Sequence, residues 1–195
     1  AVETSLEGYT VGRKLDKVGL KTSDTAELSF VDVKVPVEDL LGEENRGFSY
    51  LGQNLPSERW GIAYGAYGQA AAAVRFAQDY VQQREVFGKT VASFQNTKFE
   101  LAACKAKVDA AQAVADRALE ALDAGELTPA EAASAKVFCT EVAAEVIDRC
   151  LQLHGGYGFI NEYPIARLYS DNRVNRIYGG TNEVMKTIIA KDMGL

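Results

Sequence analysis

The sequence predicts a mainly α-helical protein in which a short β segment precedes a bundle of long helices. Two observations predict the helices. Apolar residues recur with alternating spacings of three and four over long stretches after Phe48, and a helix-start signal separates two of those stretches. One observation predicts the β segment, because residues 26–35 alternate apolar and polar side chains. We therefore expect a β segment over residues 1–45 and a helical bundle domain over residues 46–195.

The first 45 residues are predicted to form strands. Tyr9-Thr10-Val11 is a short extended segment, and the alternation over Ala26–Val35 is typical of a strand with one buried face. Pro36 should end that strand, because proline cannot donate to a ladder. Two or three strands make a poor independent sheet, so we expect this segment to belong to a larger one.

Two apolar seams predict two antiparallel helices of roughly 25 residues each, packed at a shallow angle. The first seam consists of Leu101, Cys104, Val108, Ala111, Ala115, Ala118 and Leu122. The second consists of Ala133, Val137, Thr140, Ala144, Ile147 and Leu151. Because alanine is abundant in both seams, the two backbones can approach closely.

The boundary between these helices carries specific end signals. Gly125 suits the position just after the first helix, and Thr128-Pro129-Ala130-Glu131 is a capping box with proline at the first helical position. Three further helices are predicted: one over about 48–82, a short one opened by Pro164, and one from near Thr181 to the end of the chain.

Composition excludes several classes of protein. The chain has 195 residues, a net charge of -6, three widely spaced cysteines and one histidine. The acidic balance disfavours nucleic-acid binding, and the cysteines form no disulfide framework, which indicates a reducing compartment. A single histidine disfavours zinc and multi-histidine iron sites. No apolar run is long enough for a membrane helix, and AVETSLEGYT lacks the pattern of a secretory signal.

Four segments carry glycine and polar residues that a plain bundle would not need. They are Asn54–Trp60, Arg84–Lys89 followed by Phe94-Gln95, Gln152–Gly158, and Ile177–Glu183. Each has a plain interpretation as a turn, a helix cap or a solvated surface. Each also has a functional one: Arg84 could clamp an anion, and glycines before Thr181 expose N–H groups at a helix N-terminus, where they could polarise a carbonyl. For His154, capping or packing is favoured over catalysis.

Together and in this order, the four segments resemble the C-terminal half of an acyl-CoA dehydrogenase. The Arg-x-x-Phe-Gly, Gln-x-x-Gly-Gly and Gly-Gly-Thr-Asn-Glu elements have the family's order, and Phe30–Pro36 is similar to the end of its central β domain. The resemblance covers essentially the whole chain. It implies an up-and-down four-helix bundle of the acyl-CoA dehydrogenase type, preceded by the last strands of that β domain.

The resemblance also implies a cofactor and its contacts. The cofactor is FAD, held in part across a subunit interface of a homotetramer or homodimer. The residues that match FAD contacts are Arg84, Phe87, Gln95, Gln152, Gly155, Gly156, Thr181 and Glu183. The residues that match the acyl-CoA site are Arg59, Tyr178, Gly179 and Gly180. Of these, Gly179 resembles the residue whose N–H donates to the thioester carbonyl. No metal site is implied.

The catalytic base is expected at Glu58. Many members of the family carry a glutamate where this chain has Gly179, whereas the long-chain and isovaleryl types place it on the long helix before Arg-x-x-Phe-Gly. Glu58 stands at that second position, and Tyr178–Glu183 most resembles the long-chain type. The implied reaction is α,β-dehydrogenation of an acyl-CoA to a trans-2-enoyl-CoA, on a medium-to-long or branched chain.

The sequence leaves two alternative functions open. The chain could be an oligomerising helical fragment without activity of its own, because the family's N-terminal helical domain and first half of the β domain would precede Ala1, which we expect to mark a cut. An acyl-CoA oxidase relative is a second alternative, whereas a ferritin-like metal bundle fails for lack of a Glu-x-x-His pair. The dehydrogenase reading implies an electron-transfer flavoprotein as acceptor, no nucleic-acid or membrane partner, and location in a bacterial cytoplasm or a mitochondrial matrix.

Overall fold

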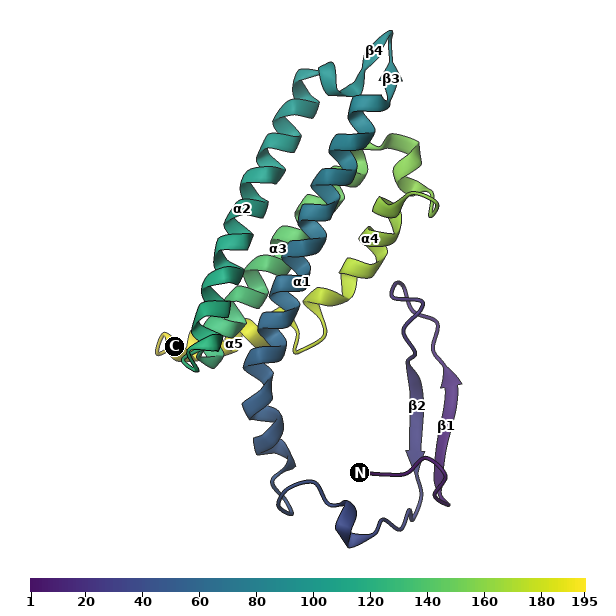
Figure 1. The fold of residues 1–195 in the computed structure, drawn as a ribbon, viewed down its shortest axis with the longest axis vertical. Coiled ribbons are helices and arrows are strands. Elements are labelled where there is room, and N and C mark those ends of the chain that lie inside the picture. The colour runs from purple at the N-terminus through teal and green to yellow at the C-terminus, as the bar shows by residue number, and fades with distance from the viewer. The chain divides into compact units, whose positions relative to one another are not determined.

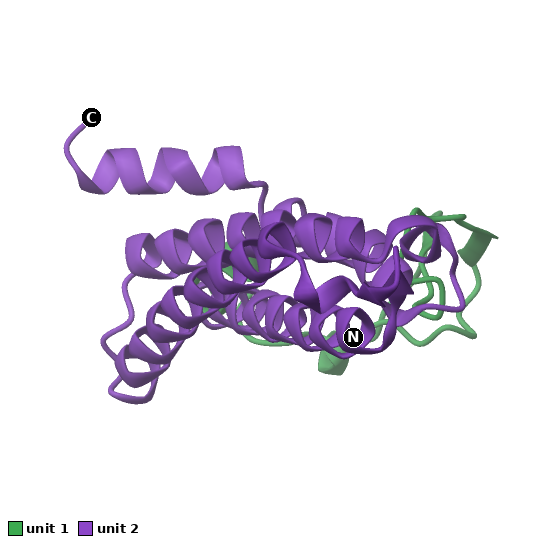
Figure 2. Ribbon diagram, turned by 90° about the horizontal axis from the view of Figure 1, so that it is seen from above, with its two compact units in different colours: residues 1–54 green, residues 55–195 purple.

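The computed structural model describes residues 1–195 and confirms the mainly α-helical fold class, with five α-helices and two short two-stranded sheets. The chain forms two compact units, Ala1–Asn54 and Leu55–Leu195, which Figure 2 shows in different colours. Their boundary falls inside the first long helix, α1 (Gly47–Gln83). The domain division between residues 45 and 46 stays a prediction.

The first unit contains an antiparallel pair of strands, β1 (Tyr9–Lys14) and β2 (Ala26–Phe30), and a 3-10 turn, η1 (Val37–Asp39). Tyr9 lies opposite Phe30, and the centroids of their rings are 5.2 Å apart. The register is irregular between Val11 and Lys14.

The prediction of one long strand over residues 26–35 is wrong in length and in burial. The strand β2 ends at Phe30, and Asp32 has a φ of 51°, a left-handed conformation that turns the chain out of the extended path. Leu28 and Phe30, on the face expected to be buried, are 54% and 55% exposed. A two-stranded ribbon has no second layer of its own to cover such a face.

The helix α1 matches the helix predicted over residues 48–82. Its buried side is a line of alanines at alternating spacings of three and four, namely Ala63, Ala66, Ala70, Ala73 and Ala77. The helix continues through the glycines at 61, 65 and 68. An added Cβ at any of the three would meet nothing within 4 Å, so no close packing requires a glycine there. Their effect is limited to helix propensity.

A tight hairpin follows α1. Its strands are β3 (Glu85–Val86) and β4 (Lys89–Thr90), and the two residues between them, Phe87 and Gly88, have φ values of 52° and 76°. Two consecutive residues with positive φ are typical of a type I′ turn. After the 3-10 turn η2 (Val91–Ser93), the chain enters α2 (Gln95–Asp123).

The predicted boundary between α2 and α3 (Pro129–Leu153) is confirmed. Gly125 has a φ of 71°, as a residue just past a helix should. The Thr128 hydroxyl accepts from the Glu131 N–H at 3.1 Å, and the Glu131 carboxylate accepts from the Thr128 N–H at 3.1 Å. This reciprocal capping box satisfies two backbone donors at the start of α3.

The helix α3 lies at the centre of the second unit and packs against α2, α4 (Pro164–Asn172) and α5 (Asn182–Asp192). The short helix at Pro164 and the last helix after Thr181 are therefore confirmed, although α5 ends before the last three residues. Two 3-10 segments, η3 (Gly155–Phe159) and η4 (Arg173–Arg176), flank α4. Figure 1 shows the β3–β4 hairpin at one end of this unit and α5 at the other.

The second apolar seam was predicted too narrowly. Val137, Ala144 and Leu151 are only half-buried, whereas the neighbouring Ala132, Ala143 and other residues of α3 are fully buried. The reason is that several helices cover α3 from different sides, so its buried surface is wider than one stripe. This wider surface includes the charged residue Lys136, which is fully buried.

We expect Glu131→Gln to lower the free energy of unfolding by about 0.5 kcal/mol at pH 7, because it removes a negative charge from a helix N-terminus. Hydrogen bonds from the Thr128 backbone, and then from its hydroxyl, hold the pKa of Glu131 below its ordinary value of 4.5. A lowered folded-state pKa stabilises the protein above the unfolded-state pKa, and that stability is lost as pH falls through the folded-state pKa. The difference between the two proteins should therefore vanish below about pH 4.

Chemical denaturation at several pH values measures this difference. Asp148→Asn, an exposed carboxylate on the same helix, is the control and should show no such pH-dependent gap. A gap of constant size from pH 7 to pH 3 would contradict the capping explanation.

Candidate active site

The turn between η4 and α5 has two consecutive residues in the left-handed region of the backbone. Gly179 and Gly180 have φ values of 64° and 94°, a conformation that favours glycine. Thr181 is then the N-cap of α5, and its hydroxyl accepts from the Val184 N–H at 3.4 Å. The N–H groups of Gly179, Gly180 and Thr181 donate no hydrogen bond to the protein. The turn therefore offers three backbone donors to a ligand.

Arg59 holds this turn from α1. Its side chain is buried, with 6% exposed, and its Nε donates to the Gly179 carbonyl at 3.3 Å. Burial lowers the pKa of Arg59, and the adjacent Glu58 charge partly opposes that shift. Arg59, predicted to line the acyl-CoA site, thus contacts the backbone of the turn in this structure.

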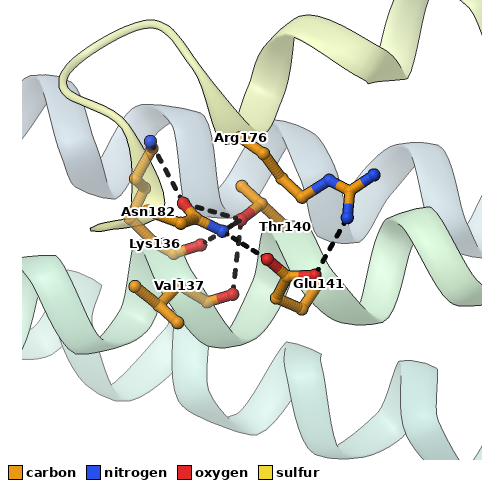
Figure 3. A network of polar contacts seen from close by, with 6 residues as sticks. All are labelled: Lys136, Val137, Thr140, Glu141, Arg176 and Asn182. Atoms are coloured by element: carbon orange, nitrogen blue, oxygen red, sulfur yellow. Dashed lines mark hydrogen bonds and ion pairs between the residues drawn. The ribbon is translucent and has the colours of Figure 1, made fainter. Parts of the chain in front are cut away.

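Lys136 holds the same turn from α3. Its Nζ donates to the Gly180 carbonyl and, at 3.3 Å, to the Asn182 side-chain oxygen. Asn182 in turn donates to the Thr140 hydroxyl at 3.0 Å and to the Glu141 carboxylate at 2.8 Å (Figure 3). Burial, and secondly the Arg59 charge, lower the pKa of Lys136.

The polar network continues from Glu141 to Arg176. The Arg176 Nη1 donates to Glu141 at 3.2 Å, as Figure 3 shows, while its Nε is buried without a partner. Neither Lys136 nor Asn182 is among the site residues predicted from the sequence. A signal for Lys136 lay in its spacing: it stands three residues after Ala133 and four before Thr140, next to Val137, which was predicted for the buried seam in its place.

Glu58 lies beside the turn on the solvent side. It is exposed, and its carboxylate oxygen is 3.6 Å from the position that a Cβ on Gly179 would take. The same Cβ would come within 2.4 Å of the Ile62 Cδ1 atom, so a side chain at position 179 requires the end of the Ile62 side chain to move. A carboxylate on Glu58 and one carried by residue 179 would thus occupy neighbouring space.

Tyr178 is fixed at the other side of the turn. Its hydroxyl donates to the Asn175 side-chain oxygen at 2.6 Å, and the Asn175 amide donates to Gln69 at 2.8 Å and to Asn172 at 2.9 Å. Burial raises the pKa of Tyr178. Three contacts from different helices therefore fix the residues Tyr178, Gly179 and Gly180, all predicted as substrate-binding.

A second group of predicted site residues surrounds a cavity of about 450 Å³. Arg84, Gly155 and Gly156 line it. The Arg84 guanidinium lies over the Tyr157 ring, 5.4 Å from the ring centroid, and is in no ion pair. A Cβ on either glycine would meet nothing within 4 Å. The cavity thus combines an unneutralised cation with accessible backbone, a combination that fits an anionic, flat ligand.

His154 lines this cavity but packs as a structural residue, as expected. It is buried and stacks on Tyr80 with ring centroids 4.5 Å apart, and its Nδ1 is 2.8 Å from the Cys150 carbonyl oxygen. Burial lowers the pKa of His154, which favours a neutral ring.

Of the other predicted FAD contacts, Thr181 is half-buried, and the remaining four are exposed and lie on helix ends or turns. Gln95 is the first residue of α2, Gln152 is in the last turn of α3, and Phe87 is 95% exposed at the hairpin tip. Glu183 is in the first turn of α5, where hydrogen bonding by its own backbone N–H lowers its pKa.

The structure does not bring all the predicted site residues together. From Glu58, α1 runs on for about 25 residues to Gln83, which at 1.5 Å per residue separates Glu58 from Gln83 by roughly 37 Å. Glu58 and Arg59 lie beside the turn that precedes α5, whereas Arg84, Gly155 and Gly156 line the cavity that follows the other end of α1. Figure 1 shows α5 at one end of the unit and the β3–β4 hairpin, which follows α1, at the other. The chain therefore carries two separate clusters of site residues.

Other kinds of site find no support among these residues. No group of three or more histidine, cysteine, aspartate or glutamate side chains is arranged to hold a metal ion. All three cysteines are buried and free. None of the helices has the combination of length and apolar character that crossing a membrane requires.

Comparison with known proteins agrees with the motif resemblance. The family described as "Acyl-CoA dehydrogenase, C-terminal domain" matches residues 45–194. The long-chain specific acyl-CoA dehydrogenase of Sus scrofa mitochondria is 47% identical over 192 residues, which cover 98% of this chain and 45% of that protein. The chain thus spans less than half the length of this relative.

Solved structures agree as well. The acyl-CoA dehydrogenase of Geobacillus kaustophilus superposes with a TM-score of 0.96 at 46% identity, over 100% of this chain and 51% of that one. The acyl-CoA dehydrogenase of Bacillus anthracis, whose structure is complexed with FAD, superposes with a TM-score of 0.93 at 32% identity, over 98% of this chain and 36% of that one. The chain belongs to the acyl-CoA dehydrogenase family and contains its C-terminal domain.

Proposed function

We propose that this chain is the catalytic C-terminal part of an FAD-dependent acyl-CoA dehydrogenase, with Glu58 as the base that removes the α-proton of the thioester. One observation carries the proposal: the Glu58 carboxylate lies 3.6 Å from the Cβ position of Gly179, beside a turn whose N–H groups are unpartnered. A base and a carbonyl-binding donor are thus within reach of the same small group.

The reaction needs both the base and the backbone N–H donor. Removal of the α-proton of a thioester places negative charge on its carbonyl oxygen, and the Gly179 N–H stabilises that charge by donating to it. Glu58 takes the proton from the adjacent carbon as a general base. FAD, when bound, accepts the β-hydrogen as a hydride, which leaves a trans-2-enoyl-CoA.

The Arg84 cavity fits the anionic part of FAD. The guanidinium would pair with pyrophosphate oxygens, and the exposed backbone of Gly155 and Gly156 would lie against the rest of the nucleotide. Phe87, Gln95, Gln152, Thr181 and Glu183 are proposed as further contacts. Because the two clusters are roughly 37 Å apart along α1, they are too far apart for one extended FAD molecule. We therefore propose a homodimer or homotetramer in which each FAD is bound by both clusters, one from each of two copies.

The resemblance to the long-chain type favours a medium-to-long or branched acyl-CoA as substrate, and an electron-transfer flavoprotein as the acceptor. Location in a bacterial cytoplasm or a mitochondrial matrix is proposed on the same ground, and a mitochondrial relative supports the second of these.

We expect Glu58→Gln, in the complete FAD-loaded enzyme, to reduce kcat by about 10²–10⁴-fold, because the amide cannot accept the α-proton. Substrate should still bind, since the turn is unchanged. Stopped-flow reduction of the flavin by acyl-CoA measures the loss. Glu120→Gln, an exposed glutamate on α2, is the control and should behave as wild type. Full turnover in Glu58→Gln would place the base elsewhere.

A relocated carboxylate should restore part of the activity. In the Glu58→Gln background, Gly179→Glu alone should recover little activity, because its Cβ would collide with the tip of the Ile62 side chain, which would have to move aside. Adding Ile62→Ala removes that collision, and we expect flavin reduction at least tenfold above Glu58→Gln. Recovery should be incomplete, since a non-glycine residue at positive φ costs about 1 kcal/mol. Equal activity with and without Ile62→Ala would contradict the geometric argument.

We expect Arg84→Gln to weaken FAD binding by about 10–100-fold, the usual loss when a charged hydrogen bond to an anion is removed. Release of flavin on dialysis, followed by its absorbance, measures this. Arg13→Gln in the β segment is the matched control. FAD retention equal to wild type in Arg84→Gln would show that the pyrophosphate lies elsewhere.

A further inference from the structure

A fully buried lysine in the bundle core is unexplained by the reaction as proposed. Lys136 has no exposed surface, and no carboxylate pairs with its ammonium group. Its partners are neutral oxygens, the Gly180 carbonyl and the Asn182 side chain. An apolar residue of this size would avoid the loss of hydration that a buried cation suffers. The stability of the bundle alone therefore does not account for a lysine here.

The peptide geometry shows what this lysine controls. A trans peptide group is planar, with its C=O and N–H on opposite edges. Lys136 draws the Gly180 carbonyl toward the core, so the Thr181 N–H of the same peptide group points the other way. Arg59 likewise draws the Gly179 carbonyl toward the core. The Gly180 N–H, which belongs to the same peptide group, therefore points the other way.

The turn needs such restraint because its backbone is intrinsically mobile. Gly179 and Gly180 are adjacent glycines, both at positive φ, and glycine has access to more conformations than any other residue. Without Lys136, the Gly180 carbonyl would lose its buried donor, and rotation of that peptide group toward water would satisfy it better. The same rotation would re-aim the Thr181 N–H directly, and through the two linked glycines it would also disturb the preceding peptide groups, which include the Gly179 N–H proposed to donate to the thioester.

We propose that Lys136 is a positioning residue for catalysis: its hold on the Gly180 carbonyl and Asn182 keeps the Gly179–Thr181 turn in the conformation that aims the Gly179 N–H at the thioester carbonyl. The inference rests on the proposed function, because it takes the turn as the carbonyl-binding site. Lys136 touches neither substrate nor cofactor and acts only through the backbone of the turn.

Lys136→Met in the complete FAD-loaded enzyme tests the inference. We expect kcat to fall 10–100-fold while KM changes less than threefold, because carbonyl polarisation is lost but the remainder of the substrate still binds. The melting temperature should be unchanged or higher. Ile147→Ala, a buried residue of the same helix, is the matched control. It should lower the melting temperature yet keep kcat within twofold of wild type.

A spectroscopic measurement separates positioning from a structural role. The probe is an acyl-CoA with sulfur in place of its β-methylene, which cannot be dehydrogenated, and with ¹³C at the thioester carbonyl. Hydrogen bonding to the carbonyl moves its ¹³C resonance downfield. We expect Lys136→Met to reduce the shift seen in wild type by at least half, and Ile147→Ala to preserve it.

A third measurement needs no substrate and keeps this inference separate from the proposed function. The Val184 and Met185 N–H groups donate to the hydroxyl and the carbonyl of Thr181. A loosened turn should therefore speed their hydrogen exchange at least tenfold in Lys136→Met and leave the α2 amides unchanged. If wild type fails to dehydrogenate any acyl-CoA, the proposed function fails, while this exchange still decides whether Lys136 restrains the turn.

Wild-type values of kcat and of the carbonyl shift in Lys136→Met would overturn the inference, even if Glu58→Gln is inactive. If Lys136→Met does not fold, Lys136→Gln replaces it, because its shorter amide side chain cannot reach the Gly180 carbonyl. The same loss of kcat and carbonyl shift is expected from it, and their retention would equally overturn the inference.

Discussion

The helical unit depends on one constraint: two buried cations, from two different helices, hold two consecutive carbonyls of a glycine turn. Arg59 of α1 binds the Gly179 carbonyl, and Lys136 of α3 binds the Gly180 carbonyl. Burying two like charges near each other is unfavourable, and the Arg59 charge contributes to the lowered pKa of Lys136. Both charges stay buried because the carbonyl dipoles replace part of the lost hydration. The backbone donors on the outer edge of the turn are thereby fixed in direction.

The alanine-rich core makes this arrangement possible. Ala63, Ala66 and Ala70 are fully buried along α1, and small residues on α2 and α3 face them. Small side chains allow helix axes to lie close together, so that side chains from α1 and α3 both reach the same turn. The Trp60 indole N–H donates to the Ala115 carbonyl at 3.2 Å and ties α1 to α2 just beside Arg59. The geometry of the turn therefore depends on the close packing of the core.

Sequence patterns predicted most of the helices because their signals are local. The capping box at Thr128 and the glycine at 125 determine a helix boundary whatever surrounds them, and the spacing of the alanines determines the buried face. Lys136 was missed because a lysine within a helix is ordinarily exposed, and its burial depends on segments distant in the sequence, such as the Gly180 turn and α5, that pack on α3. The strand expected over residues 26–35 was too long because alternation cannot reveal the left-handed turn at Asp32. Motifs thus indicated candidate site residues, and the contacts that hold these residues in place come from tertiary packing.

The length of α1 determines how much of a flavin site one copy of this chain could build. The rise of the helix sets the distance between the backbones of Glu58 and Arg84. Rotation of side chains does not change that backbone distance. Ligands that span a shorter distance can bind one cluster or the other in a given copy, but not both. If both clusters serve the same cofactor, a second copy must supply one of them, and assembly becomes a requirement of the chemistry. Activity and oligomeric state would then be linked through the cofactor itself, since each bound molecule would join two copies and stabilise their association.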